Sequence, residues 1–174
     1  MFDNIGRAFS SYYQIICIKL IFSIFIVFFE LSLSQIYLFY QKTPFILYTF
    51  IFLWVSEIGL ASYWVYFLIG LFYDFIFGNN LGLSTICILL IVPILALAKT
   101  NILNFDYTKK FLAFTIFITL LLILKISFFF MLFLNWPKIE IIIFQVLLTL
   151  IFYPVILLCF SPIIKLTNLI SGYS

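Results

Sequence analysis

Apolar runs separated by short polar clusters organise the chain from end to end. The clusters are turn-forming or charged, and they read YQKTP (40–44), SEIGLAS (56–62), GNNLG (78–82), KTNILNFDYTKK (99–110) and NWPK (135–138). A helix needs roughly 20 apolar residues to cross the hydrocarbon of a bilayer. The five breaks therefore predict six membrane helices, expected near residues 14–39, 44–56, 62–77, 82–98, 110–134 and 139–164.

The second and third predicted helices are short, and their connection carries one carboxylate and no basic residue. A merged or re-entrant pair is an open alternative that would give five helices. Basic residues favour six, because Lys and Arg resist translocation across the membrane. Six helices with a cytoplasmic N-terminus put only Lys42 and Lys138 outside and also make the C-terminus cytoplasmic. The basic residues then on the inner side are Arg7, Lys19, Lys99, Lys109, Lys110 and Lys165.

The composition agrees with a chain embedded in lipid. Of the 174 residues 67% are hydrophobic and only 9% are charged, with a mean hydropathy of +1.32. So few charged side chains cannot cover the surface of a soluble domain, so we expect one all-α integral membrane bundle over residues 1–174. The first apolar run is too long for a signal-peptide core and is expected to remain as an anchor. Trp54, Trp64 and Trp136 fall near predicted helix ends, where aromatic belts form.

The sequence lacks the residues that most catalytic mechanisms need. Histidine is absent, and Cys17, Cys87 and Cys159 stand alone in apolar surroundings, so we expect no zinc site, disulfide or cofactor. An intramembrane hydrolase would have no Ser–His relay, and Glu30 with Asp74 is the one candidate for an aspartyl dyad. We therefore expect no enzymatic activity. A net charge of +3 spread along the loops also argues against nucleic-acid binding.

Three ionisable residues, Glu30, Asp74 and Lys125, lie well inside predicted helices. Each costs about 3 kcal/mol in the membrane on insertion scales, so each needs a partner or water. At about 1.5 Å per residue, they lie roughly 18 to 24 Å from the starts of their helices, which gives them similar depths. We hypothesise that Lys125 pairs with one carboxylate and that the other is protonated, hydrogen-bonded or hydrated. Alternatively, Lys125 snorkels outward and Glu30 reaches the headgroups.

The stretch YFLIGLFYDFIFGNNLGLST (66–85) surrounds Asp74 with small residues. Gly70, Asp74 and Gly78 are four residues apart, so on a helix they share one face, to which another backbone can come close. Gly78 and Gly82 bracket a turn whose Asn side chains can cap the next helix. Residues 62–98 therefore predict a tight helical hairpin with a polar tip. Packing and turn chemistry alone would explain this pattern.

The longer segment FLIGLFYDFIFGNNLGLSTICILLIV resembles the hallmark segment of MreD, the family of bacterial rod shape-determining membrane proteins. The family pattern is approximately Gly-Leu-x-x-Asp-x-x-x-Gly-x-x-x-Gly. The segment covers about a fifth of the chain, and the chain length and six-helix layout also fit. SEIGLAS stands where the family usually has a basic loop. The matching positions are Gly70, Leu71, Asp74, Gly78, Leu81 and Gly82.

The resemblance implies a non-enzymatic scaffold of the cell elongation machinery in the bacterial inner membrane, involved in rod shape and lateral peptidoglycan synthesis. The implied partner is MreC, a bitopic membrane protein, and through it the MreB filaments and the peptidoglycan glycosyltransferase and transpeptidase. The implied fold is similar to the substrate-binding subunits of energy-coupling-factor transporters. Asp74 is then the motif residue, with no role assigned to it.

A membrane substrate-binding subunit of a small-molecule, vitamin-type transporter is the alternative function. It would need a cavity with convergent polar groups, which Glu30, Gln35, Asp74, Lys125 and Gln145 could line. The two functions differ in what should co-purify with the protein. A bitopic protein with a periplasmic domain would support the scaffold, whereas a pair of cytoplasmic ATPases would support transport.

Overall fold

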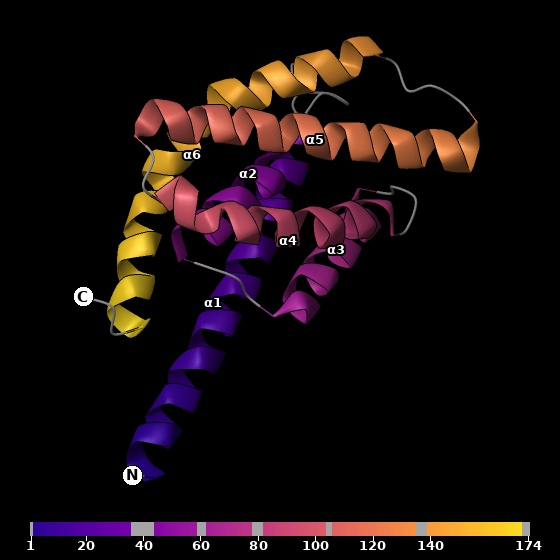
Figure 1. Ribbon diagram of the computed structural model, residues 1–174. Helices are drawn as coiled ribbons and strands as arrows, with labels where there is room; N and C mark the ends of the chain where they lie inside the picture. Colours follow the sequence, from indigo (N-terminus) through magenta and orange to yellow (C-terminus); the bar gives the residue numbers. More distant parts are fainter. Residues whose placement is uncertain are drawn as a thin grey trace.

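The computed structural model describes residues 2–35, 44–58, 62–77, 82–103, 106–134 and 139–171, and the side chains within them except those of 2–15, 58, 103 and 163–171. The regular elements in these ranges are all helices (Figure 1). Their bounds are α1 Phe2–Ser34, α2 Ile46–Leu53, the π-helical turn η2 Trp54–Ile58, α3 Tyr63–Ile76, α4 Leu83–Leu103, α5 Tyr107–Phe133 and α6 Ile139–Ser171.

Each predicted break separates two of these helices, although several helices extend beyond the predicted bounds. α1 begins at Phe2, where the sequence predicted a start near residue 14, and α6 continues to Ser171. Apolar composition marks the part of a helix that lipid can surround, whereas the backbone hydrogen bonds continue into polar turns. The composition therefore predicted where the helices are interrupted better than where they end.

In the described part of the chain, four helices are long and apolar enough to cross a membrane, which confirms the prediction of a helical membrane protein. The segments are Ile16–Ser34, Leu83–Ile102, Tyr107–Phe133 and Ile139–Pro162. The remaining apolar segments, Ile46–Glu57 and Tyr63–Ile76, are shorter. A hydrocarbon core about 30 Å thick needs a longer helix than either of these. The count of six spans therefore stays a prediction.

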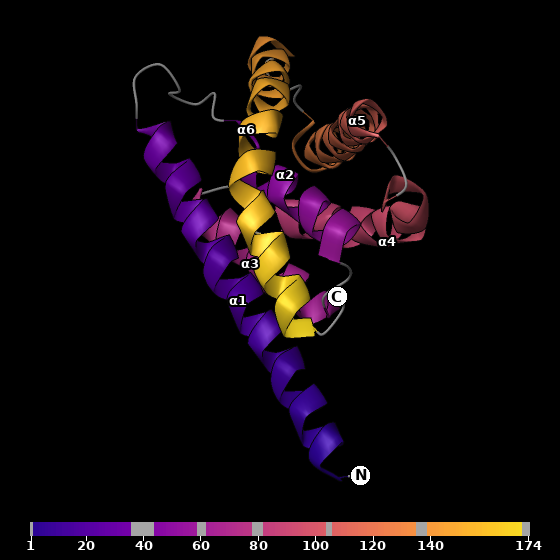
Figure 2. The ribbon, with the colours of Figure 1, turned by 90° about the vertical axis from the view of Figure 1, so that its left-hand side faces the viewer.

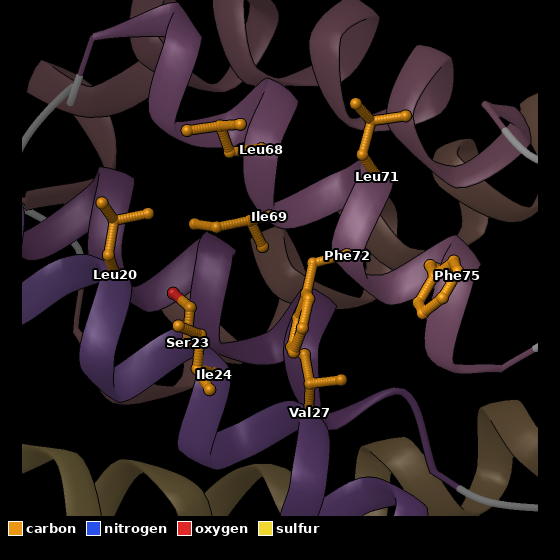
Figure 3. A pocket seen from close by; sticks show the side chains of 9 residues that line it. All are labelled: Leu20, Ser23, Ile24, Val27, Leu68, Ile69, Leu71, Phe72 and Phe75. Carbon is orange, nitrogen blue, oxygen red and sulfur yellow. The ribbon is translucent and has the colours of Figure 1, made fainter.

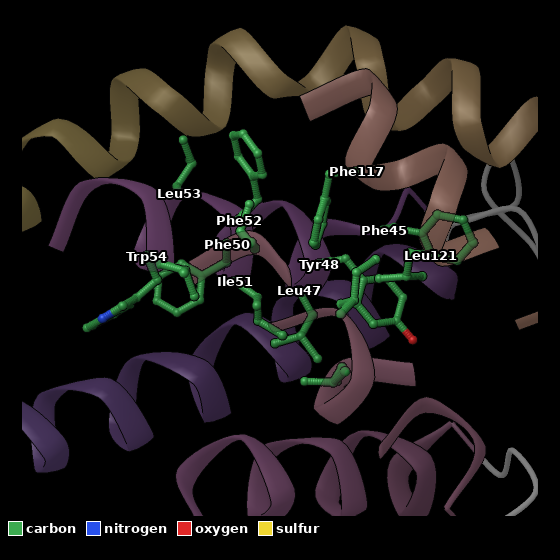
Figure 4. Close-up of a cluster of buried hydrophobic side chains, with 14 of the residues drawn as sticks. Phe45, Leu47, Tyr48, Phe50, Ile51, Phe52, Leu53, Trp54, Phe117 and Leu121 are labelled. Atoms are coloured by element: carbon green, nitrogen blue, oxygen red, sulfur yellow. The ribbon is translucent and has the colours of Figure 1, made fainter. Parts of the chain in front are cut away.

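The short helix α2 forms the centre of the structure. All eight of its residues are buried, from Ile46 to Leu53, and it packs against α1, α5 and α6. Figure 4 shows its side chains in one apolar cluster, which Phe117 and Leu121 of α5 complete. Because protein surrounds α2 on every side, this helix does not need the length that contact with lipid would demand. Its strongly apolar composition reflects burial, which sequence alone cannot distinguish from lipid exposure.

Around α2, the most extensive contact between two helices of the described chain joins α3 to α4. α1 packs against α3 and also against α6, which it accompanies along one side of the molecule (Figure 2).

Two of the three tryptophans can be compared with the predicted aromatic belt. Trp64 is exposed, as a belt residue would be, but Trp54 is almost completely buried in the core, so its prediction was wrong. Trp136 lies outside the described residues.

Candidate functional site

Asp74 caps the helix that follows its own. Its side chain is fully buried on α3, and its carboxylate accepts hydrogen bonds from the backbone N–H groups of Gly82 (3.0 Å), Ser84 (3.1 Å) and Thr85 (3.3 Å). The Thr85 hydroxyl donates to the same oxygen at 3.2 Å. The first N–H groups of a helix have no partner within that helix. Asp74 therefore closes the start of α4 from a neighbouring helix.

The residue one turn earlier brings the two backbones together. A Cβ atom placed on Gly70 would lie 2.7 Å from the Cα of Thr85 and 2.9 Å from its hydroxyl oxygen, so only glycine fits without a shift. Gly82, just before α4, has a φ of +97°, which an L side chain rarely adopts. The close hairpin expected over 62–98 is therefore present, with Gly70 at its crossing.

The other motif positions can be placed only in part. Leu71 lines an open groove between α1 and α3 and does not join the capping site (Figure 3). Gly78 and Leu81 lie outside the described residues, as do Asn79 and Asn80, for which a capping role was predicted. In the described part of the hairpin the cap comes from Asp74.

Glu30 of α1 caps the start of α2 in the same way. It is fully buried on α1, and its Oε2 accepts a hydrogen bond of 3.1 Å from the Leu47 N–H in the first turn of α2. Its Oε1 accepts a hydrogen bond of 2.8 Å from the hydroxyl of Tyr73. The preceding Phe45 N–H donates to the buried hydroxyl of Thr149 on α6 at 2.9 Å. The start of α2 is thus held by side chains from α1 and α6.

These contacts explain why two carboxylates can lie inside an apolar bundle. Burying a carboxylate is expensive unless hydrogen-bond donors replace its water. A helix N-terminus supplies such donors together with a partial positive charge equivalent to roughly half an elementary charge. Glu30 and Asp74 each receive this compensation from one helix. The two buried carboxylates, which looked anomalous in the sequence, are therefore compensated by backbone N–H groups.

Lys125 lies near both carboxylates without forming the direct ion pair that was hypothesised. Its ammonium is 5.5 Å from the ring centroid of Phe45 and 5.7 Å from that of Tyr48, within electrostatic reach of Glu30 and Asp74. It does not snorkel outward either, because its ammonium lies over the faces of two buried rings, Phe45 and Tyr48. An ion pair that the structure does show is that of Lys110 with Glu57, at 2.7 Å between α5 and η2. Amide donors already occupy the carboxylates, and aromatic faces offer the cation an alternative.

Two buried hydroxyls complete this region of the core. Tyr48 Oη and Ser84 Oγ are both inaccessible, and neither has a well-aligned hydrogen-bond partner in the described chain. Of the other predicted cavity residues, Gln35 is exposed at the end of α1, and Gln145 is half-buried on α6. Within the described residues no group of three or more potential metal ligands occurs.

Sequence reasoning missed the hydroxyl residues of this site. Tyr73 precedes Asp74, and Ser84 with Thr85 follows Gly82, a position where hydroxyl side chains commonly mark a helix start. That signal was available. Thr149 carried no local signal, because its partner lies 104 residues away in the sequence.

Taken together, these features define a helical membrane protein in which four of the described helices are long enough to cross a bilayer and buried carboxylates cap the starts of α2 and α4. Comparison with known proteins adds no family to this description. No protein-family profile matches the chain, and neither a curated protein nor a solved structure matches it. The likeness to MreD therefore rests on the motif residues.

Proposed function

We propose that this protein is a non-enzymatic scaffold of the MreD type in the bacterial inner membrane, with both termini in the cytoplasm. One observation carries the proposal: Asp74, the charged residue of the motif, directs its carboxylate at the start of α4. Three backbone N–H groups and one hydroxyl donate to it, which leaves little capacity for a substrate or a proton relay. A motif built in this way shapes a helical hairpin and performs no reaction.

In this proposal the protein binds the membrane helix of MreC and is linked through MreC to MreB and to the peptidoglycan synthases. The elongation machinery would thereby act in lateral wall synthesis and rod shape. The close packing of α3 against α4 supports this role, because a preformed surface lowers the ordering cost when a partner helix binds. The exposed surface of the hairpin includes Leu68, Phe75 and Ile94.

Cysteine crosslinking tests the proposed interface. Cys17, Cys87 and Cys159 would be replaced by Ala, and single cysteines introduced at Phe75, Asn79 or Asn80 would be paired with cysteines along the MreC membrane helix. We expect crosslinks from the hairpin and none from the control Met131→Cys on the distant end of α5, which is also exposed. Crosslinks from Met131 without any from the hairpin would remove the hairpin from the interface. If MreC does not co-purify with the protein, that result contradicts the scaffold function itself.

The second candidate is the substrate-binding subunit of a small-molecule transporter. The observation that favours it is the pair of buried hydroxyls, Tyr48 Oη and Ser84 Oγ, which lie within reach of each other but form no well-aligned hydrogen bond among the described residues. Buried polar groups of this kind are usually satisfied, so a ligand or a water could complete them. Mass spectrometry of the purified protein separates the two functions. A retained small molecule together with a pair of ATPases would favour transport over the scaffold.

A further inference from the structure

A buried tyrosine of α6 packs beside the ion pair of Lys110 and Glu57. The ring of Tyr153 stacks on that of Phe114 with 4.3 Å between the ring centroids, and its centroid is 5.6 Å from that of Phe111. Lys110 directly precedes Phe111 and lies one helical turn before Phe114 on α5. Tyr153 therefore contacts the part of α5 that carries the lysine.

The same tyrosine ring also lies near the segment that carries the carboxylate. The ring centroids of Tyr153 and Phe52 are 6.4 Å apart, and Phe52 lies on α2 two residues before the π-helical turn η2. Glu57 follows Phe52 by five residues, which is the hydrogen-bonding interval of a π-helix. α6 is in contact with η2, and Glu57 is an electrostatic neighbour of Tyr153. Tyr153 thus lies against the segments that carry both members of the ion pair.

The hydroxyl of Tyr153 has no hydrogen-bond partner in the described chain, although its residue is fully buried. A buried phenol hydroxyl usually has a partner, because leaving it unpaired is unfavourable. Two polar neighbours surround it, the exposed Tyr107 and the carboxylate of Glu57. An ionised carboxylate accepts hydrogen bonds and donates none, whereas a second hydroxyl does both. Glu57 is therefore the better acceptor for this unused donor.

The partner that Glu57 has in this structure can be released. Lys110 Nζ lies 2.7 Å from Oε1 of Glu57, and the two side chains are 23% and 19% exposed. Dissolved ions screen a pair that is partly exposed, and an anion can attract the lysine. Without Lys110 the carboxylate would be a mostly buried charge that needs another donor. The hydroxyl of Tyr153 is a buried donor in its neighbourhood.

We propose that Glu57 exchanges partners: it binds Lys110 in the structure described, and it accepts a hydrogen bond from the Tyr153 hydroxyl when the ion pair is broken. A high salt concentration, or an anion that binds Lys110, produces the second state. The exchange is a conformational switch, because η2 is joined to α5 in one state and to α6 in the other. A hydrogen bond to a charged acceptor is strong enough to replace a partly exposed ion pair.

Double-mutant cycles on the full chain in detergent test the exchange. The coupling between Tyr153→Phe and Glu57→Gln is measured from the equilibrium constant of unfolding, once with Lys110 present and once in Lys110→Gln. At low salt we expect no coupling when Lys110 is present. In Lys110→Gln the coupling should reach about 10-fold in the equilibrium constant, as for a buried hydrogen bond to a charged group. A high salt concentration should produce coupling with Lys110 present as well.

Two matched controls separate the exchange from general effects. Tyr107→Phe removes the exposed neighbouring hydroxyl and should show no coupling to Glu57→Gln in either background. Lys109→Gln removes an adjacent exposed charge and should not induce the coupling. No coupling in Lys110→Gln, or coupling of equal size in every background, would overturn the proposal. If Lys110→Gln fails to fold, the salt titration decides, and a Tyr153–Glu57 coupling that does not rise with salt would contradict the exchange.

Discussion

Asp74 accepts the backbone N–H of Ser84 with both carboxylate oxygens, at 3.1 Å and 3.2 Å. The adjacent Tyr73 donates its hydroxyl to Glu30, whose other oxygen accepts the N–H of Leu47. Two consecutive residues of α3 therefore connect both capped helix starts. This connection predicts that substitutions at either carboxylate act on stability through the backbone amides that lose their acceptor.

Asp74→Asn should be tolerated far better than Asp74→Leu. Asparagine keeps one acceptor oxygen, so we expect a loss of about 1 kcal/mol of stability, as for a weakened helix cap. Leucine leaves three N–H groups without an acceptor and should cost about 3 kcal/mol or more. Thermal unfolding in detergent measures both, and Ser84→Ala, which keeps its N–H, is the control. Lost function in a fully stable Asp74→Asn would instead indicate proton or substrate chemistry.

Gly70→Ala should separate α3 from α4. The new Cβ would lie 2.7 Å from the Cα of Thr85, a backbone atom that cannot rotate away. We expect a destabilisation of about 1–3 kcal/mol, and a larger one for Gly70→Leu. Ile94→Ala, on an exposed face of α4, is the control in the same unfolding assay and should change stability little. An unchanged melting temperature for Gly70→Leu would contradict the close crossing.

Tyr73→Phe should weaken the link between α3 and the Glu30 cap. It removes a buried hydrogen bond to a carboxylate, which contributes about 1.5–3 kcal/mol. A double-mutant cycle with Glu30→Gln isolates the pairwise energy. Tyr63→Phe, on an exposed tyrosine, provides the reference for removing a phenol hydroxyl. Strictly additive effects of Tyr73→Phe and Glu30→Gln would mean that the two residues act independently.

Lys125→Met should cost less than the loss of a member of a buried ion pair. Removing one partner of such a pair costs about 3–5 kcal/mol. Because Glu30 and Asp74 are already compensated by backbone amides, we expect a smaller loss from Lys125→Met, below about 2 kcal/mol on the same reasoning. Lys109→Met is the exposed control. A loss as large as that of a broken buried pair would show that Lys125 carries the compensation.

The contact between Lys110 and Glu57 should be weak and sensitive to salt. Their side chains are 23% and 19% exposed, so water and ions screen the pair. A double-mutant cycle with Lys110→Gln and Glu57→Gln should give a coupling energy below about 1 kcal/mol. The coupling energy should decrease further when the salt concentration is raised. A large coupling energy that does not change with salt concentration would contradict this description.

The sequence by itself determined the helical membrane character and the positions of the breaks. In lipid every backbone polar group must be satisfied internally, so long apolar runs interrupted by polar clusters leave helices as the main solution. It also placed Gly70 and Asp74 on one face of α3, because residues four apart lie together on a helix. These inferences depend on side-chain type and spacing, which the sequence states directly.

Only the tertiary structure decided what the buried charges contact. The sequence suggested a side-chain partner, Lys125, for Glu30 or Asp74, but the hydrogen-bond partners are N–H groups at the starts of α2 and α4. Because almost every residue has a backbone N–H, the sequence does not indicate which of these groups bind a carboxylate. The central position of α2 and the burial of Trp54 were hidden for a related reason, since contact with lipid and contact with protein favour the same apolar side chains.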